Sequence, residues 1–112
     1  MEACVDASDE LRERIERALE PQNKTTPTGW VLDTLEVALW AFLHTSSLET
    51  ALIMAVNRGE DADTVGAVTG ALAGAHYGLS AIPARWLETL QDRTLLQEQA
   101  DRLLALAGPT ET

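Results

Sequence analysis

Four glycines recur at every fourth position in the middle of the chain, at Gly66, Gly70, Gly74 and Gly78. Residues four apart lie on one face of an α-helix. The spacing therefore predicts a helix from about Thr64 to Tyr77 with a stripe of bare backbone. Each interior glycine costs about 1 kcal/mol relative to alanine. We expect a neighbouring helix to pack closely against this stripe and to offset that cost.

The remaining composition also favours helices. The chain has 112 residues, of which 46% are hydrophobic and only 4% are aromatic, and it is rich in alanine and leucine, which are good helix formers. A chain of this length forms one domain at most. We expect residues 1–112 to form a single all-α domain without strands. About six helices are predicted, at residues 6–20, 33–44, 46 to near 59, about 64–77, a short one from residue 80, and about 94–106.

Apolar periodicity predicts which helix faces are buried. In the first helix the apolar residues share one face, and the charged face is expected in solvent; the apolar residues are Leu11, Ile15, Ala18 and Leu19. The helix over residues 33–44 is apolar almost all round, which predicts a central position. The last helix is expected to bury four leucines, namely Leu95, Leu96, Leu103 and Leu104. The three tryptophans fall on predicted inner faces.

Local signals mark loops and helix ends. Residues 21–29 contain two prolines and a glycine, which is typical of a surface loop. Ser46 is followed three residues later by Glu49, the spacing of a capping box at the start of a helix.

Charge and cysteine content narrow the classes of partner. The formal net charge is −10, which argues against nucleic acid because phosphate binding needs clustered Lys and Arg. The single cysteine, Cys4, forms no internal disulfide, and no secretory signal opens the chain, so we expect a cytoplasmic location.

Glycines four apart also occur in packed membrane helices. Residues 65–82 are too polar for a span, however, with His76, Tyr77 and Ser80 among them.

Two carboxylates and a hydroxyl stand at the predicted start of the glycine-rich helix, as Asp61, Asp63 and Thr64. We call Gly59–Thr64 the acidic segment. Close carboxylates repel each other unless a cation or a set of donors neutralises them, and oxygen-only clusters favour hard metals such as Mg²⁺ or Mn²⁺. The pattern is also typical of helix capping, with Asp63 accepting backbone N–H bonds, and by themselves these residues favour capping. The residues alone leave both interpretations open.

Several motifs together resemble a known family. In order along the chain they are Gly29–Trp40, Ala55–Asn57, the acidic segment, Gly70–Ala75 with Tyr77 and Gly78, and Ile82–Trp86. This series resembles the C-terminal part of the ADP-ribosylglycohydrolase family, which includes the dinitrogenase-reductase-activating glycohydrolases. The resemblance covers residues 29–106, and residues 1–28 form a helix and loop outside it.

The resemblance implies an all-helical fold that holds two Mg²⁺ or Mn²⁺ ions and hydrolyses an ADP-ribose N- or O-glycosidic linkage. It implies that Asp61, Asp63 and Thr64 are metal ligands. Glu60 stands where many members have glycine, and it either adds a carboxylate near the pocket or points outward. Asn57 either braces the acidic segment through its amide or simply ends a helix.

One part of the family pattern has no counterpart in this chain. Family members also carry a Thr/Ser-Asp-Asp metal segment and substrate-binding loops in an N-terminal half. The resemblance therefore implies that this chain supplies half of a dinuclear site, completed by the missing half, and that an ADP-ribosylated substrate binds the completed site. The alternative is a truncated, non-catalytic packing or interaction module that self-associates.

Overall fold

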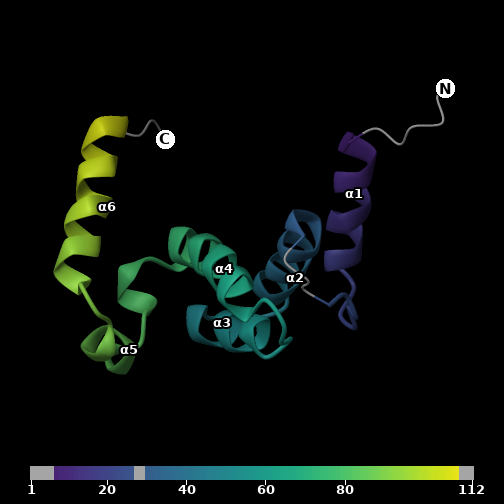
Figure 1. The fold of residues 1–112 in the computed structure, drawn as a ribbon, viewed down its shortest axis with the longest axis horizontal. Helices are drawn as coiled ribbons and strands as arrows, with labels where there is room; N and C mark the ends of the chain where they lie inside the picture. Colours follow the sequence, from purple (N-terminus) through teal and green to yellow (C-terminus); the bar gives the residue numbers. More distant parts are fainter. Residues whose placement is uncertain (1–6, 27–29, 109–112) are drawn as a thin grey trace. The chain divides into compact units, whose positions relative to one another are not determined.

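The structure, a computed structural model, describes residues 7–26 and 30–108, and these contain helices but no strand. The helices are α1 (Ala7–Ala18), α2 (Val31–Leu43), α3 (Leu48–Val56), α4 (Ala62–Tyr77), the 3₁₀-helix η1 (Leu79–Ala81), α5 (Ala84–Thr89) and α6 (Arg93–Ala107) (Figure 1). The predicted all-α class with six α-helices is confirmed for these residues.

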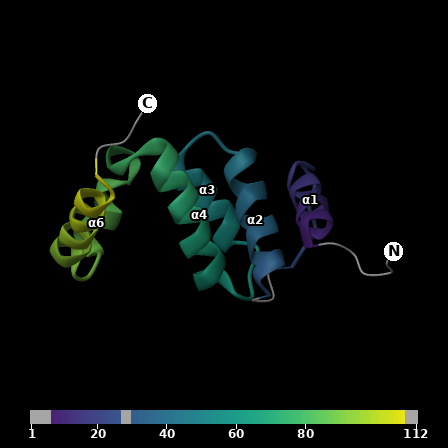
Figure 2. The same cartoon turned by 90° about the horizontal axis from the view of Figure 1, so that it is seen from above.

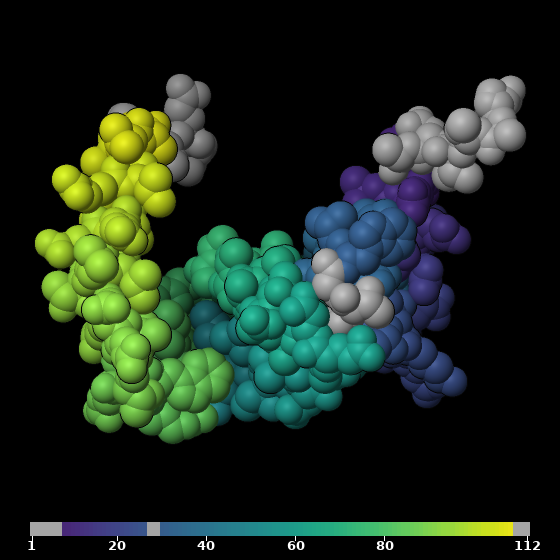
Figure 3. All heavy atoms as spheres, in the orientation of Figure 1, coloured from purple at the N-terminus to yellow at the C-terminus, as the bar shows by residue number. Residues whose placement is uncertain are grey.

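Contacts along the chain divide it into two units, one up to Ile82 and one from Pro83. In the first unit α2, α3 and α4 pack on one another, and α1 packs on α2 (Figure 2). The spheres of α2, α3 and α4 accordingly form one continuous surface (Figure 3). The core at their junction is built from small residues, with Trp40 and Met54 packed against it; its buried members are Val37, Ala41, Ala55 and Val65.

The glycine stripe packs as predicted over its first half. A Cβ placed on Gly66 would lie 3.3 Å from Cγ2 of Val56, and one on Gly70 would lie 3.7 Å from Cδ2 of Leu52. Both glycines therefore bring α4 close to α3. A Cβ on Gly74 would meet nothing within 4 Å, so this glycine is not required by packing. Gly78 lies beyond the end of α4 and has a φ of +87°.

Helix α2 has features that its predicted central position did not specify. Its apolar character does place it centrally, but Glu36 is fully buried, whereas Val31 is 70% exposed. The charged face of α1 is likewise not wholly in solvent, because Arg14 faces α2 with a side chain only 11% exposed. Charge pairing across the two helices explains both differences, since a buried carboxylate is tolerated when donors surround it.

Other local predictions also need correction. The N-cap of α3 is Ser47, whose side chain accepts a hydrogen bond from the Thr50 backbone N–H at 3.1 Å. The expected pairing of Ser46 with Glu49 therefore starts one residue too early. Trp30 is 51% exposed, so it does not lie on an inner face.

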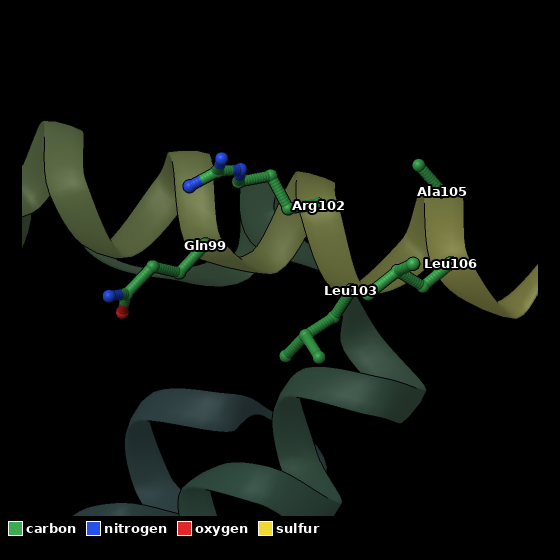
Figure 4. A pocket seen from close by; sticks show the side chains of 5 residues that line it. All are labelled: Gln99, Arg102, Leu103, Ala105 and Leu106. Atoms are coloured by element: carbon green, nitrogen blue, oxygen red, sulfur yellow. The ribbon is translucent and has the colours of Figure 1, made fainter.

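The second unit contains α5 and α6, and neither helix has a buried residue. The leucines expected to be buried in α6 are between 48% and 68% exposed; they are Leu95, Leu96, Leu103 and Leu104. Figure 4 shows a surface pocket along α6 with Leu103 and Leu106 in its lining. The apolar periodicity of α6 is real, but no residue of this helix is buried among the described residues.

A helix that crosses a bilayer is about 20 residues long and predominantly apolar. Within residues 7–26 and 30–108, no helix combines sufficient length and apolarity to cross a membrane.

Candidate functional site

The acidic segment joins α3 to α4 through a tight turn. Two consecutive residues have positive φ angles, Gly59 at +85° and Glu60 at +53°. The Ala62 backbone N–H donates to the carbonyl of Glu60 at 2.8 Å, which closes the turn before α4 begins. Glutamate rarely adopts a positive φ, so this turn carries local backbone strain.

The three predicted metal ligands lie at the start of α4. Asp61 is the N-cap residue and is half-buried, while Asp63 and Thr64 are exposed in the first turn. The Asp61 side chain makes no capping hydrogen bond. Asp63 Oδ1 accepts a hydrogen bond from the N–H of the adjacent Thr64 at 3.0 Å, which is not the span of a capping bond. The capping pattern expected of Asp63 is therefore not formed.

The donor types suit a hard cation, but their number is small. Carboxylate and hydroxyl oxygens are the ligands that Mg²⁺ and Mn²⁺ prefer. Within the part of the chain that the structure describes, no three His, Cys, Asp or Glu residues gather closely enough to hold a metal ion. The assignment of Asp61, Asp63 and Thr64 as ligands stays a prediction.

The two residues expected to support the ligands lie at the surface. Asn57 is the C-cap residue of α3 and is exposed, which fits helix termination. Glu60 is exposed as well, consistent with the outward orientation. Bracing by the Asn57 amide is untested.

A polar cluster around one buried carboxylate, which the sequence did not predict, includes the residue that precedes this segment. We call it the Glu36 network; its members are Arg14, Arg17, Asn23, Thr25, Asp33, Glu36 and Arg58. Glu36 Oε1 accepts from Arg14 Nη1 at 2.9 Å, and the same nitrogen lies 2.6 Å from Asp33 Oδ1. Glu36 Oε2 accepts from Asn23 Nδ2 at 2.6 Å and from the Thr25 hydroxyl. Arg17 Nε lies 3.5 Å from the same oxygen.

These partners decide the charge state of Glu36. Burial by itself would raise the pKa of the carboxyl group, but hydrogen bonds from Thr25, Asn23 and Arg14 and the charge of Arg17 outweigh it and hold the pKa below the ordinary value of 4.5. For Arg14, burial acts to lower the pKa, whereas its bonds to Asp33 and Glu36 raise it above the usual value. The buried pair is therefore ionised at neutral pH.

Arg58 connects the Glu36 network to the acidic segment, because it immediately precedes Gly59. Its Nη2 donates to Asn23 Oδ1 at 3.2 Å and to the backbone carbonyl of Thr25. Its guanidinium lies 4.5 Å from the ring centroid of Trp40. Burial lowers the pKa of Arg58, and the charge of Glu36 opposes this shift. The other nitrogen, Nη1, is buried without a hydrogen-bond partner among the described residues.

One sequence signal for this network was available. A single glutamate within a helix that is apolar almost all round must itself be largely buried, and a buried carboxylate requires donors. The donors Asn23 and Thr25 stand in a loop with no periodicity, so their role could not be identified from the pattern.

Comparison with known proteins identifies the family. A sequence model described as ADP-ribosylglycohydrolase matches residues 1–112. The chain belongs to this family. The chain is 38% identical over 111 residues to the ADP-ribosyl-[dinitrogen reductase] glycohydrolase of Rhodospirillum rubrum, a match covering 96% of the chain and 37% of that protein. It is 44% identical over 80 residues to the ADP-ribosylarginine hydrolase Tri1 of Serratia proteamaculans, covering 71% of the chain and 22% of that relative.

These matches define how much of a glycohydrolase the chain represents. The chain spans between 22% and 37% of the length of these two relatives. The recognised resemblance is confirmed, and the family match extends beyond residues 29–106 to α1 and the loop that follows it. The Glu36 network therefore lies entirely within the glycohydrolase-like sequence. No solved structure matches the chain.

Proposed function

We propose that the chain supplies Asp61, Asp63 and Thr64 as ligands for Mg²⁺ or Mn²⁺ in an enzyme that hydrolyses an ADP-ribose N- or O-glycosidic linkage. Family membership and the names of the relatives support the reaction class. The observation that carries the ligand assignment is that Asp61, the N-cap residue, makes no capping hydrogen bond with its side chain, while the Asp63 carboxylate bonds to the adjacent Thr64 N–H.

The position of these residues also suits a pair of negative charges. The N-terminus of a helix carries the positive end of its dipole, which stabilises nearby carboxylates. Asp61 and Asp63 therefore gain from the helix dipole, and the lack of a capping bond leaves Asp61 available for a cation. When bound, the metal pair would hold the vicinal ribose hydroxyls, orient a water molecule and stabilise charge at the reacting sugar.

The ligand count limits what these residues can do by themselves. Mg²⁺ prefers six ligands, and three oxygens from one helical turn supply half of them. We therefore propose that they form half of a dinuclear site, with the remaining ligands supplied by water or by the part of the glycohydrolase fold that this chain lacks. A cytoplasmic location and an ADP-ribosylated substrate belong to the same proposal.

Paramagnetic NMR tests the ligand assignment directly. Mn²⁺ added to the isotopically labelled chain should broaden the amide signals of the acidic segment first, because broadening falls steeply with distance from the ion. The double variant Asp61→Asn with Asp63→Asn should abolish this selective broadening. Asp101→Asn, at an exposed carboxylate of α6, is the matched control and should leave it unchanged. Uniform broadening over all acidic residues would refute the proposal.

A second candidate function belongs to a different class. The exposed leucines of α6 favour a non-catalytic module that packs against a second copy of the chain, because contiguous apolar surface marks interaction sites. Light scattering over a concentration series tests this candidate. A dimer that Leu103→Gln dissociates, together with no selective Mn²⁺ effect, would favour the packing module over the hydrolase.

A further inference from the structure

We infer that Arg58 is a positioning residue, which transmits the rigidity of the Glu36 network to the acidic segment and so holds the cation ligands in place. The inference rests on the proposed function for the role of Asp61 and Asp63. The effect of Arg58 on the conformational order of the acidic segment can be measured without metal, and so independently of the proposed function.

The guanidinium group of Arg58 is held on two sides. Its Nη2 bonds to the side chain of Asn23 and to the carbonyl of Thr25, and its guanidinium stacks over Trp40 at 4.5 Å. Trp40 is itself tied to the same loop, because its Nε1 donates to the carbonyl of Pro21 at 3.1 Å. A planar guanidinium held by bonds at one edge and a ring on its face has little freedom to rotate.

The loop contacting Arg58 is itself anchored. The Asn23 amide donates to Glu36 Oε2 at 2.6 Å and also to the backbone carbonyl of Arg17 at 2.9 Å. The Thr25 hydroxyl donates to the same Glu36 oxygen. Glu36 is fully buried in the central helix. The loop is therefore attached to a buried residue of the central helix.

The acidic segment needs such support. Glu60 has a φ of +53°, a conformation that persists in a non-glycine residue only when its surroundings impose it. On the C-terminal side the turn is closed by the Ala62 to Glu60 bond and by the Val65 N–H, which donates to the Asp61 carbonyl at 3.1 Å. On the N-terminal side, Arg58 is the last residue before the two positive φ angles. The backbone N–H groups of Arg58 and Gly59 donate to α3 carbonyls at 3.2 Å each, and the side-chain bonds of Arg58 add a second anchor at this point.

Charge and positioning predict opposite effects when Arg58 is removed. A positive side chain close to a cation site repels the cation, so its loss through electrostatics alone would strengthen Mn²⁺ binding. Loss of positioning would weaken binding, since partners that orient metal ligands are commonly worth tenfold or more in affinity. The direction of the change therefore distinguishes the two roles.

The test uses Arg58→Met in the full chain, with Arg93→Met as the matched control. Arg93 has the same charge but is exposed in the second unit, at the start of α6. Amide hydrogen exchange and heteronuclear relaxation, recorded without metal, report order in the acidic segment. Mn²⁺ titration, followed by selective broadening, reports affinity. Arg58→Lys keeps the charge without the guanidinium fork, and it serves if Arg58→Met does not fold.

We expect Arg58→Met to increase exchange and mobility at Glu60 and Asp61 while the central amides of α2 and α4 keep their protection. We also expect Mn²⁺ to bind roughly tenfold more weakly, with Arg58→Lys showing smaller changes in the same direction and Arg93→Met none. Unchanged order in the acidic segment, or tighter Mn²⁺ binding, would overturn the inference. If wild type shows no selective Mn²⁺ binding, the proposed function fails, and the order measurement still decides whether Arg58 positions the segment.

Discussion

Replacing Glu36 with alanine tests whether the buried carboxylate holds the first unit together. Glu36 is fully buried and accepts hydrogen bonds from Arg14, Asn23 and Thr25. Its removal leaves Arg14, whose side chain is 11% exposed, paired with Asp33 alone. Breaking a buried ion pair by removing one partner costs about 3–5 kcal/mol, because the other charge stays buried.

The structure supports a value within this range. The loss is smaller than the sum of three hydrogen bonds to a charged group at roughly 1.5–3 kcal/mol each, because the part-buried donors can bond to water or to other partners once Glu36 is gone. The Arg17 side chain is 47% exposed and adds little. We therefore expect Glu36→Ala to lower the free energy of unfolding by about 3–4 kcal/mol. Domains of this kind are stable by only about 5–15 kcal/mol in total, so the variant should be close to unfolding.

Urea denaturation followed by circular dichroism and tryptophan fluorescence measures this loss. With a denaturant slope of about 1–2 kcal/mol per molar urea, the transition midpoint should fall by roughly 1.5–4 M. Glu36→Gln keeps the volume but turns an amide N–H₂ toward donors, so it should also destabilise, by a smaller amount. Glu13→Gln, at an exposed residue of α1, is the control and should change stability by no more than about 0.5 kcal/mol.

A small loss of stability in Glu36→Ala would contradict this expectation. If Glu36→Ala costs less than about 1 kcal/mol, the Glu36 network contributes no more than a solvent-exposed ion pair. Its role in anchoring the loop to the central helix would then have to be abandoned.

Three further predictions concern the charge of Glu36, the N-cap of α3 and the glycine stripe of α4. Because the folded pKa of Glu36 lies below the ordinary value of 4.5, its contribution is present above that pH and is lost as the pH falls through the folded pKa. Urea midpoints measured against pH should therefore decline more steeply below about 4.5 in wild type than in Glu36→Gln. Ser47→Ala should cost about 1 kcal/mol of stability in the same assay, whereas Ser46→Ala should be nearly neutral, since Ser47 is the N-cap. Gly74→Ala should stabilise by about 0.5–1 kcal/mol and by more than Gly66→Ala, whose new methyl would lie 3.3 Å from a valine methyl group; equal gains would contradict the close approach.

The helices could be predicted from the sequence because their signals are local. Periodicity and the prolines and glycines between helices place α2, α3 and α4 within about three residues of their observed bounds. The close approach of a neighbouring helix to the glycine stripe was also predicted from spacing, and α3 makes this approach at Gly66. Which helix faces are buried is a different matter, because it depends on what packs against them. The leucines of α6 satisfy the pattern of a buried face and are nevertheless exposed.

The Glu36 network could not be predicted, because its members are far apart in the sequence. Arg14 and Glu36 are 22 residues apart, and Arg58 and Asn23 are 35 residues apart. A surface loop and a charged helix face are the usual interpretations for such residues. Only the folded arrangement shows that they surround one carboxylate. The acidic segment, by contrast, was recognised from the sequence because its residues are consecutive, but its ligand role depends on cations and on residues beyond it.

The position of the Glu36 network changes how residues 7–26 should be regarded. The family resemblance first recognised covers residues 29–106 and would make α1 and its loop an appendage. Yet Glu36, within that resemblance, receives its donors from Arg14, Asn23 and Thr25, which lie outside it. Without them, a carboxylate would be buried unpaired in the central helix, and Arg58 would lose both of its acceptors. Helix α1 and its loop are therefore structural components of the unit that carries Asp61 and Asp63, in agreement with a family match that includes them.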